Sequence, residues 1–557
     1  MRRKPVSEWT MDELKQILQR VRMALGEEDF KVMHAVVETL SYLTHLAKDK
    51  QAAEIYRILG SSKSEKTRNI LRVLQMESET DSEPADDPTE SEKPAETPPE
   101  SSAPDGQGRP AGIQKKAKGH GRNGAGDYKG ARQIQVSLES IKSGDRCPCG
   151  KGNLYEIDDS PLVRIVGQAP IHADIYRLER LRCNTCGDVF TAKAPVGIGS
   201  EKYDATSTAM VALMKYGSGF PFHRLERLEG NLGIPLPAST QWEMVRDGAA
   251  GMQPVFEELI RQGASGEVLY NDDTSVKILE FLDHERVIED PKLPGRTGVF
   301  TTGIVSTQEG RTIALFFSGR KHAGENLADV LAKRAAELPR PIQMCDALSR
   351  NFPRELEVIL ANCLTHGRRY FVEAAANFPE ECRYSLELLG KVYHNDAIAR
   401  EQTMTPDQRL KFHQTQSTPL MDEMKGWLNK QLDEKLCEPN SDLGSAVTYM
   451  LNHWGPLTLF LRVAGAPLDS TIVERALKKA ILHRRNSLFY KTQRGARVGD
   501  LFMSLIYTCQ LSDVNPFDYL TTLLRNADRL AHQPAEWMPW NYAQTLASFA
   551  VAASAAN

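Results

Sequence analysis

Apolar and polar residues alternate along this chain with a period that changes from one region to the next. From Val268 onward, short apolar runs rich in β-branched and aromatic residues predict strands. The predicted strands cover residues 268–279, 298–306, 311–318 and 341–346. A stretch with helical spacing, from Ala323 to Leu338, separates the third strand from the fourth. The middle of the chain is therefore expected to be α/β.

The order of these elements limits the topology. Three strands, a helix and a fourth strand follow one another in a ribonuclease-H-like α/β core, in which the first and fourth strands lie side by side. Residues 361–455 are mostly polar with helical spacing, and such a segment is too long for a loop inside a compact domain. We therefore expect a helical insertion between the four strands and a later helix that carries Glu474.

The region before this core changes composition along its length. Residues 7–75 carry apolar stripes at helical spacing, which fit a small helical bundle, a dimerising helix pair or a helix-turn-helix that binds DNA ends. After Glu77 the chain is rich in Ser, Pro, Glu and Asp, then in Gly, Lys and Arg, and it cannot bury a core. In this linker Lys115, Lys116 and Arg122 belong to a basic arm that could lie along DNA or stay solvated.

Four of the nine cysteines lie in two pairs. Cys147 and Cys149 form a C-x-C pair, and Cys183 and Cys186 form a C-x-x-C pair. Thiolates in two such knuckles suit one tetrahedral Zn²⁺, so we expect a zinc ribbon with a structural ion. The alternative is buried free thiols. An odd total of cysteines does not fit a disulfide framework.

Composition excludes some classes of protein. The hydrophobic fraction of 41% is ordinary for a globular protein, and we find neither a signal peptide nor an apolar run of membrane length. We therefore expect a soluble, cytoplasmic protein with no membrane partner. The net charge of −4 conceals an acidic tract near 77–100 and basic stretches at 115–132 and 475–497, where phosphates could bind.

Three acids that are far apart in the sequence are candidates for catalysis. Asp272 and Asp346 each close a short apolar run, and Glu474 lies in a stretch with helical spacing. Hard divalent cations prefer carboxylate oxygens, and two cations about 3.5–4 Å apart can activate an attacking oxygen and stabilise the leaving one. With the cysteine pairs and basic segments, these acids indicate a DDE transposase. Asp273 competes with Asp272, because alternation places the two on opposite strand faces without saying which face is the site.

Further residues are candidates for DNA contact. Between Phe220 and Trp242, two helical stretches flank a turn that contains Gly233, and Ser239 could open the second helix. This pattern fits a helix-turn-helix, and it also fits an ordinary helix pair.

Two arginine pairs follow the candidate acids. Arg368 and Arg369 come after Asp346, and Arg484 and Arg485 come after Glu474. They could hold the scissile phosphate, or they could be solvated helix faces. His366, beside the first pair, belongs to a residue type that is more often structural than catalytic when it stands alone.

These patterns divide the chain into successive regions. They are an N-terminal helical region (1–76), a disordered linker with a basic end (77–135), a zinc-ribbon domain (136–195), a helix-turn-helix-like segment (196–262), the first part of a ribonuclease-H-like core (263–360), a helical insertion (361–455), the second part of the core (456–510) and a C-terminal helical region (511–557). Several domains are expected, because 557 residues are too many for one hydrophobic core.

At these residues the chain resembles the large transposase, TnpC type, of the bacterial insertion-sequence-66 family, over nearly its whole length. The motifs that carry the resemblance are Gly119-His-Gly-Arg122, Asn271-Asp272-Asp273-Thr274, Gln343-Met-Cys-Asp346-Ala, Cys363-Leu-Thr-His366-Gly-Arg368-Arg369, Glu474-Arg475-Ala-Leu-Lys and Met538-Pro-Trp540-Asn541. Their order along the chain is that of the family.

The resemblance implies roles and partners. The similarity of residues 271–274 to the family's A-D-E-T places Asp272, rather than Asp273, in a catalytic triad with Asp346 and Glu474. It implies two Mg²⁺ ions, with Mn²⁺ as the alternative, and cleavage and transfer of DNA at the terminal inverted repeats of an insertion sequence. It also implies a homo-oligomeric synaptic complex with target DNA and accessory proteins of the same element. The rival expectation is a domesticated, catalytically silent DNA-binding protein.

Overall fold

The computed structural model describes residues 201–282, 296–353 and 357–555, together with scattered residues between 126 and 199. The chain forms two compact units, one of residues 1–83 and 173–557, the other of residues 84–172. The predicted N-terminal helices, the four paired cysteines, Lys115, Lys116 and Arg122 lie outside the described residues. Within the smaller unit, Arg146 and Asn153 form an isolated antiparallel bridge.

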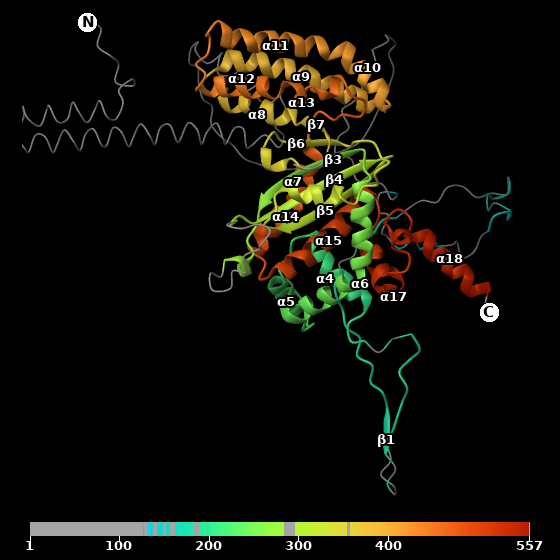
Figure 1. The fold of residues 1–557 in the computed structure, drawn as a ribbon. Coiled ribbons are helices and arrows are strands. Elements are labelled where there is room, and N and C mark those ends of the chain that lie inside the picture. The colour runs from blue at the N-terminus through green and yellow to red at the C-terminus, as the bar shows by residue number, and fades with distance from the viewer. Residues whose placement is uncertain are drawn as a thin grey trace, which may run out of the picture. The chain divides into compact units, whose positions relative to one another are not determined.

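A five-stranded mixed sheet organises the larger unit (Figure 1). Its strands are β3 (Val268–Ser275), β4 (Phe300–Gln308), β5 (Arg311–Gly319), β6 (Ile342–Cys345) and β7 (Ile359–Asn362), in the spatial order β5-β4-β3-β6-β7. Neighbours among β3, β4 and β5 are antiparallel, whereas β6 is parallel to both β3 and β7. A separate hairpin, β1 (Arg180–Arg182) with β2 (Val189–Thr191), is antiparallel.

The four predicted strands form, with ends shifted by a few residues. The first and the fourth are neighbours, as expected, because Tyr270 on β3 pairs with Met344 on β6. The α/β prediction is thus confirmed as a mixed α/β fold with many helices. Strand β7 escaped the sequence analysis because a short apolar run cannot be told from a buried helical segment by periodicity alone.

Helices cover both faces of the sheet and one of its edges. Those in contact with β3, β4 or β5 are α6 (Ala238–Ala264), α7 (Ala323–Leu331), α14 (Thr471–Ser487) and α15 (Gln493–Leu511). Helices α4 (Ala205–Ala212), α5 (Phe222–Asn231), α16 (Pro516–Arg525) and α17 (Ala527–Leu530) pack against other helices, and α18 (Tyr542–Ala555) lies near the C-terminus. Helix α14 packs against β3 and β4 from the face of Asp272, and α7 packs against the same strands from the face of Asp273.

Helix α15 covers the edge strand β5. Alternate backbone N–H groups of β5 donate to side chains one helical turn apart: Ala314 to Thr508 Oγ1 (3.1 Å), Phe316 to Ser504 Oγ (2.9 Å) and Ser318 to Asp500 Oδ2 (2.7 Å). The rise of four helical residues nearly equals that of two strand residues, so the two rows stay in step. These hydrogen bonds satisfy buried edge N–H groups that no strand can pair.

The helix-turn-helix-like pattern forms α5, a turn at Gly233 and α6. Gly233 has a φ of 82°, a conformation that suits glycine. Helix α6 starts at Ala238, after Pro237, one residue before the predicted opening at Ser239. One face of this 27-residue helix is buried along much of its length, for example at Val245 and Met252. That face belongs to the core, and DNA could meet only the other one.

Helices also occupy the range of the predicted insertion. They are α8 (Leu364–Ala374), α9 (Pro379–Glu401), α10 (Pro406–Gln416), α11 (Thr418–Asp433), α12 (Asp442–Asn452) and α13 (Trp454–Leu457). Their buried side chains, such as Leu386 and Val447, share one apolar cluster with Met344 of β6 and Ala361 of β7. The helices therefore stack on the β6–β7 side of the sheet (Figure 1). None of the described helices is long and apolar enough to cross a membrane.

Candidate active site

Asp272 and Asp346 lie at the same end of the parallel strands β3 and β6. Tyr270 pairs with Met344, and each aspartate follows its strand's paired residue by two positions. The pKa of Asp272 is raised to about 7, first because the carboxyl is buried and then because Asp346 lies nearby. The N–H of Asp273 donates to Asp272 Oδ1 at 2.8 Å, and this hydrogen bond lowers the pKa of Asp272 in part. Two partly buried carboxylates thus lie close together.

Asp273 points to the other face of β3. Its Oδ2 lies 3.2 Å from His322 Nδ1, and its Oδ1 lies 3.3 Å from a guanidinium nitrogen of Arg350. Only 1% of its side chain is exposed. The side chain therefore connects β3 to the start of α7 and to the short 3₁₀ turn at Ser349–Asn351. Neighbouring residues on a strand point to opposite faces, so Asp272 and Asp273 have different partners. Asp272 is the member of the pair that faces Asp346.

The turn after β6 orients Asp346. The amide of Asn351 donates to Asp346 Oδ1, and the N–H of Leu348 donates to the same oxygen at 3.3 Å. The carbonyl of Asn351 in turn accepts bonds from Asn271 (2.8 Å) and Gln343 (2.7 Å). This buried network fixes the turn to the sheet, so the Asp346 carboxylate has little freedom to move away from Asp272.

Glu474 reaches the site from the first turn of α14. The helix approaches the sheet closely because Gly303, the register partner of Asp272, has no side chain. A Cβ at Gly303 would lie 3.1 Å from atoms of Leu477 and 3.4 Å from Val473, both on α14. Glu474 Oε1 is buried, and among the described residues it has no hydrogen-bond partner. A positive charge or a hydrogen-bond donor would stabilise a buried carboxylate oxygen in that state.

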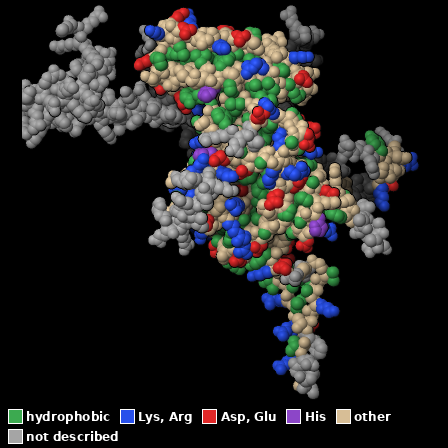
Figure 2. Space-filling view, viewed as in Figure 1, with side chains coloured by type: hydrophobic (Ala, Val, Ile, Leu, Met, Phe, Trp, Pro, Cys, Tyr) green, Lys and Arg blue, Asp and Glu red, His purple; other side chains and the backbone are tan. Residues whose placement is uncertain are grey.

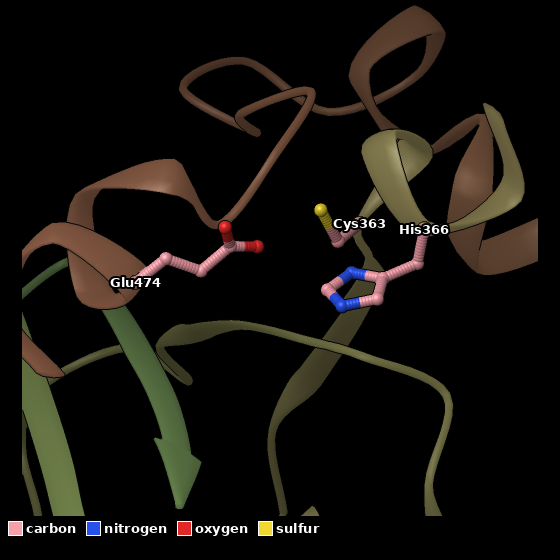
Figure 3. A group of neighbouring side chains, drawn as sticks. All are labelled: Cys363, His366 and Glu474. Atoms are coloured by element: carbon pink, nitrogen blue, oxygen red, sulfur yellow. The ribbon is translucent and has the colours of Figure 1, made fainter. Parts of the chain in front are cut away.

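Cys363 and His366 face Glu474 from the start of α8 (Figure 3). One potential ligand atom from each of the three residues lies within 4.8 Å of the others. Cys363 Sγ accepts a hydrogen bond from the N–H of Ser470 at 3.3 Å, and burial raises the pKa of this thiol. His366 also lies near enough to Asp272 to lower its pKa in part. His366 on α8 therefore lies between the aspartates of β3 and β6 on one side and Glu474 of α14 on the other.

This donor set fits divalent cations. The carboxylates of Asp272 and Asp346 repel each other unless positive charge lies between them, and Glu474, beside His366, has an unsatisfied oxygen. Oxygen ligands of this kind are those that Mg²⁺ and Mn²⁺ prefer. Cations held here could polarise a phosphoryl group or an attacking hydroxyl.

Within each arginine pair, one member is exposed to solvent and the other is not. Arg368 is buried, with 5% of its surface exposed, whereas Arg369 is exposed. Arg484 donates to Thr274 Oγ1 at 3.1 Å and to Ser275 Oγ at 2.9 Å, whereas Arg485 is exposed. Burial and these bonds leave Arg369 and Arg485 as the members open to solvent. In the face seen in Figure 2, Lys and Arg side chains alternate with acidic ones.

Sequence reasoning did not place His366 or Asn351 in the site. Asn351 carries no motif signal, because its role depends on a turn that returns to β3 and β6. His366 did carry one: it stands three residues after Cys363, at the start of the helix that follows β7. Helical geometry places such residues on one face.

Comparison with known proteins adds independent information. A model of the family described as "Transposase IS66 family" matches residues 202–498, more than half of the chain, and this range includes all three acids. Two proteins of Sinorhizobium fredii (strain NBRC 101917 / NGR234) are also similar. "Uncharacterized protein y4hP" is 26% identical over 66% of this chain and 68% of its own length. "Uncharacterized protein y4jD" is 26% identical over 71% of this chain and 78% of its own length.

Proposed function

The chain belongs to the IS66 transposase family, and we propose that it is a DDE transposase that binds the terminal inverted repeats of an insertion sequence and cleaves and transfers DNA strands. The observation that carries this proposal is the proximity of Asp272 to Asp346, with His366 lying near both Asp272 and Glu474. The raised pKa of Asp272 and the unsatisfied oxygen of Glu474 support cation binding at that point.

The three acids would hold two Mg²⁺ ions, with Mn²⁺ as the alternative, through their carboxylate oxygens. The bound cations would supply activation of the attacking water or 3′-hydroxyl and stabilisation of the leaving oxygen. The chain's own part is positioning. Asn351 orients Asp346, Gly303 admits α14 and thereby Glu474, and Asp273 holds the opposite face of β3 in place. No covalent enzyme intermediate is required.

The same proposal covers the finer architecture. The five strands would form a ribonuclease-H-like core, with the helices of residues 361–455 as an insertion before α14. Cys147, Cys149, Cys183 and Cys186 would hold one structural Zn²⁺. In support, each pair falls in the sequence between antiparallel partners: Arg146 with Asn153, and Arg182 with Val189.

The partners would be transposon ends, target DNA, further copies of this chain in a synaptic complex, and accessory proteins of the same element. Exposed basic side chains such as Arg369 and Arg485 would meet the DNA backbone. The chemistry would take place on DNA in the cytoplasm of a bacterium.

A cleavage assay with the purified chain tests the function. The substrates are duplexes that carry the ends of the chain's native element, incubated with Mg²⁺, and scrambled duplexes of equal length serve as competitors. We expect nicks at the element ends and joined products, both abolished by EDTA. Asp407→Asn, which alters an exposed carboxylate on α10, should leave the products unchanged. End binding without any cleavage would instead favour the domesticated DNA-binding protein.

A further inference from the structure

His366 is a polar side chain in the acidic site to which the three-acid scheme gives no role. It is half-buried in the first turn of α8, where Figure 3 shows its ring directed toward Glu474. Its Nδ1 is buried and lacks a hydrogen-bond partner among the described residues. Leaving a buried nitrogen unsatisfied costs about 1–3 kcal/mol, so a structural role alone does not account for it.

The neighbours of His366 are acidic. Glu474 offers a carboxylate oxygen within 4.8 Å of an imidazole nitrogen, and Asp272 is near enough for a mutual electrostatic effect. No hydrogen bond joins His366 to Glu474 in the described structure, although both have an unsatisfied buried atom. Two ligands of one cation, each about 2.0–2.2 Å from it, lie up to roughly 4 Å apart. Since no direct bond joins these two described side chains, a small closure of the spacing would let both bind one cation.

We propose that His366 is a direct ligand, with Glu474, of a divalent cation at the acidic site. This inference rests on the proposed cation-binding function of Asp272, Asp346 and Glu474. Cys363 acts differently: its thiol accepts the N–H of Ser470 and so ties the start of α8 to the start of α14. It is a positioning residue that sets the distance between His366 and Glu474.

A nitrogen ligand changes which cation the site prefers. Mg²⁺ takes oxygen ligands almost exclusively and gives up its waters reluctantly, whereas first-row transition ions accept imidazole. The site should therefore bind Mn²⁺ more tightly than Mg²⁺, and part of that preference should come from one side chain. An all-carboxylate site lacks this source of discrimination.

Pulsed electron paramagnetic resonance of Mn²⁺ on the full-length protein tests the ligand directly. With one equivalent of Mn²⁺, we expect ¹⁴N modulation from a coordinated imidazole, replaced by a ¹⁵N pattern after ¹⁵N-histidine labelling. His366→Gln should lose the modulation. His394→Gln, which changes an exposed histidine on α9, should keep it. Nitrogen modulation that persists unchanged in His366→Gln would overturn the proposal.

Affinity measurements separate this proposal from the one on which it rests. His366→Gln should weaken Mn²⁺ binding about tenfold and Mg²⁺ binding by less than about threefold. His366→Asn should behave alike, and thermal unfolding without metal checks that both variants fold. If Asp272→Asn and Asp346→Asn leave Mn²⁺ affinity unchanged, the proposal that these carboxylates bind the cation is wrong. If they abolish binding while His366→Gln keeps the wild-type preference for Mn²⁺, only the histidine ligand is wrong.

Discussion

Asp272 lies directly opposite Gly303 in the register of β3 and β4, and the absent side chain at Gly303 leaves room for Leu477 and Val473 of α14. The carboxylate of Asp272 and the helix that carries Glu474 thus share one face of the sheet. Glycine at this position lets α14 approach the sheet beside Asp272, although it contributes no side chain to the site.

Gly303→Ala and Gly303→Val should therefore reduce activity in graded fashion. The alanine methyl meets the flexible end of Leu477 and should be tolerated with a modest loss. Valine should displace α14, cost about 1–3 kcal/mol of stability through overpacking and separate Glu474 from the aspartates. The measurements are DNA cleavage and thermal unfolding. Gly426→Val, on α11 with open space around it, is the control, and equal losses in both valine variants would contradict this account.

Single substitutions in the triad should abolish chemistry and spare DNA binding. Asp272→Asn, Asp346→Asn and Glu474→Gln each remove a charged cation ligand, so strand cleavage with Mg²⁺ should fall by about a hundredfold or more. End binding, measured by mobility shift, should change little, because phosphate contacts supply most of the affinity.

Asp273→Asn provides the contrast to Asp272→Asn. Its carboxylate pairs with Arg350 and His322 on the far face of β3, so the loss should appear in stability, at about 1–3 kcal/mol. Residual cleavage per folded molecule should stay well above that of Asp272→Asn. Equal kinetic defects with unchanged stability would place Asp273 in the catalytic site instead.

Asp272→Asn should stabilise the metal-free protein at neutral pH. The folded-state pKa of Asp272 is about 7, above its ordinary value of 3.8. Between these values the unfolded chain ionises first, so ionisation of this group lowers wild-type stability progressively as pH rises from about 4 to 7. The variant lacks this penalty and should gain roughly 1–3 kcal/mol across that window. Denaturant titrations at pH 4, 5.5 and 7.5 measure the difference.

Added Mg²⁺ should make wild type more stable than Asp272→Asn, because the cation binds the folded wild type and not the variant. Stabilisation at a hundredfold excess over Kd is about 2.7 kcal/mol. If metal-free Asp272→Asn is less stable than metal-free wild type at pH 7.5, ionised Asp272 does not destabilise the folded protein.

The exposed arginines should act through the DNA backbone. Arg369→Ala with Arg485→Ala should weaken binding to all sequences alike and lower the slope of log K against log salt by roughly one per lost phosphate contact. The control is Lys391→Ala with Lys411→Ala, a pair of exposed cations on α9 and α10. If the salt slope of the arginine double variant equals that of wild type, the DNA path lies elsewhere.

One zinc ion per chain should copurify with the protein. Cys147, Cys149, Cys183 and Cys186 would fill all four positions, which makes the ion structural. Cys183→Ser should lower zinc content and local stability, whereas Cys437→Ser, at a buried free cysteine of the insertion, should retain the metal. Elemental analysis measures both, and zinc-free fresh protein would exclude the site.

The sequence by itself determined four of the five strands of the sheet, the order of elements that brings Asp272 beside Asp346, and the kinds of side chain available for chemistry. The pairing of the first and fourth strands was expected from the order of the elements along the chain. The strands follow from local periodicity, which is recorded in short stretches of residues. The helices around Glu474 and in the insertion were predictable for the same reason.

Only the tertiary structure decided which neighbouring residue faces which partner. Alternation left Asp272 and Asp273 equivalent, and contacts with Asp346 on one face and with Arg350 on the other distinguish them. The arginine pairs divide into buried and exposed members because helix packing, not charge, sets their orientation. His366 joins the acids because β7 and α8 return beside α14. Contacts between residues distant in the sequence create that proximity, and no local pattern records it.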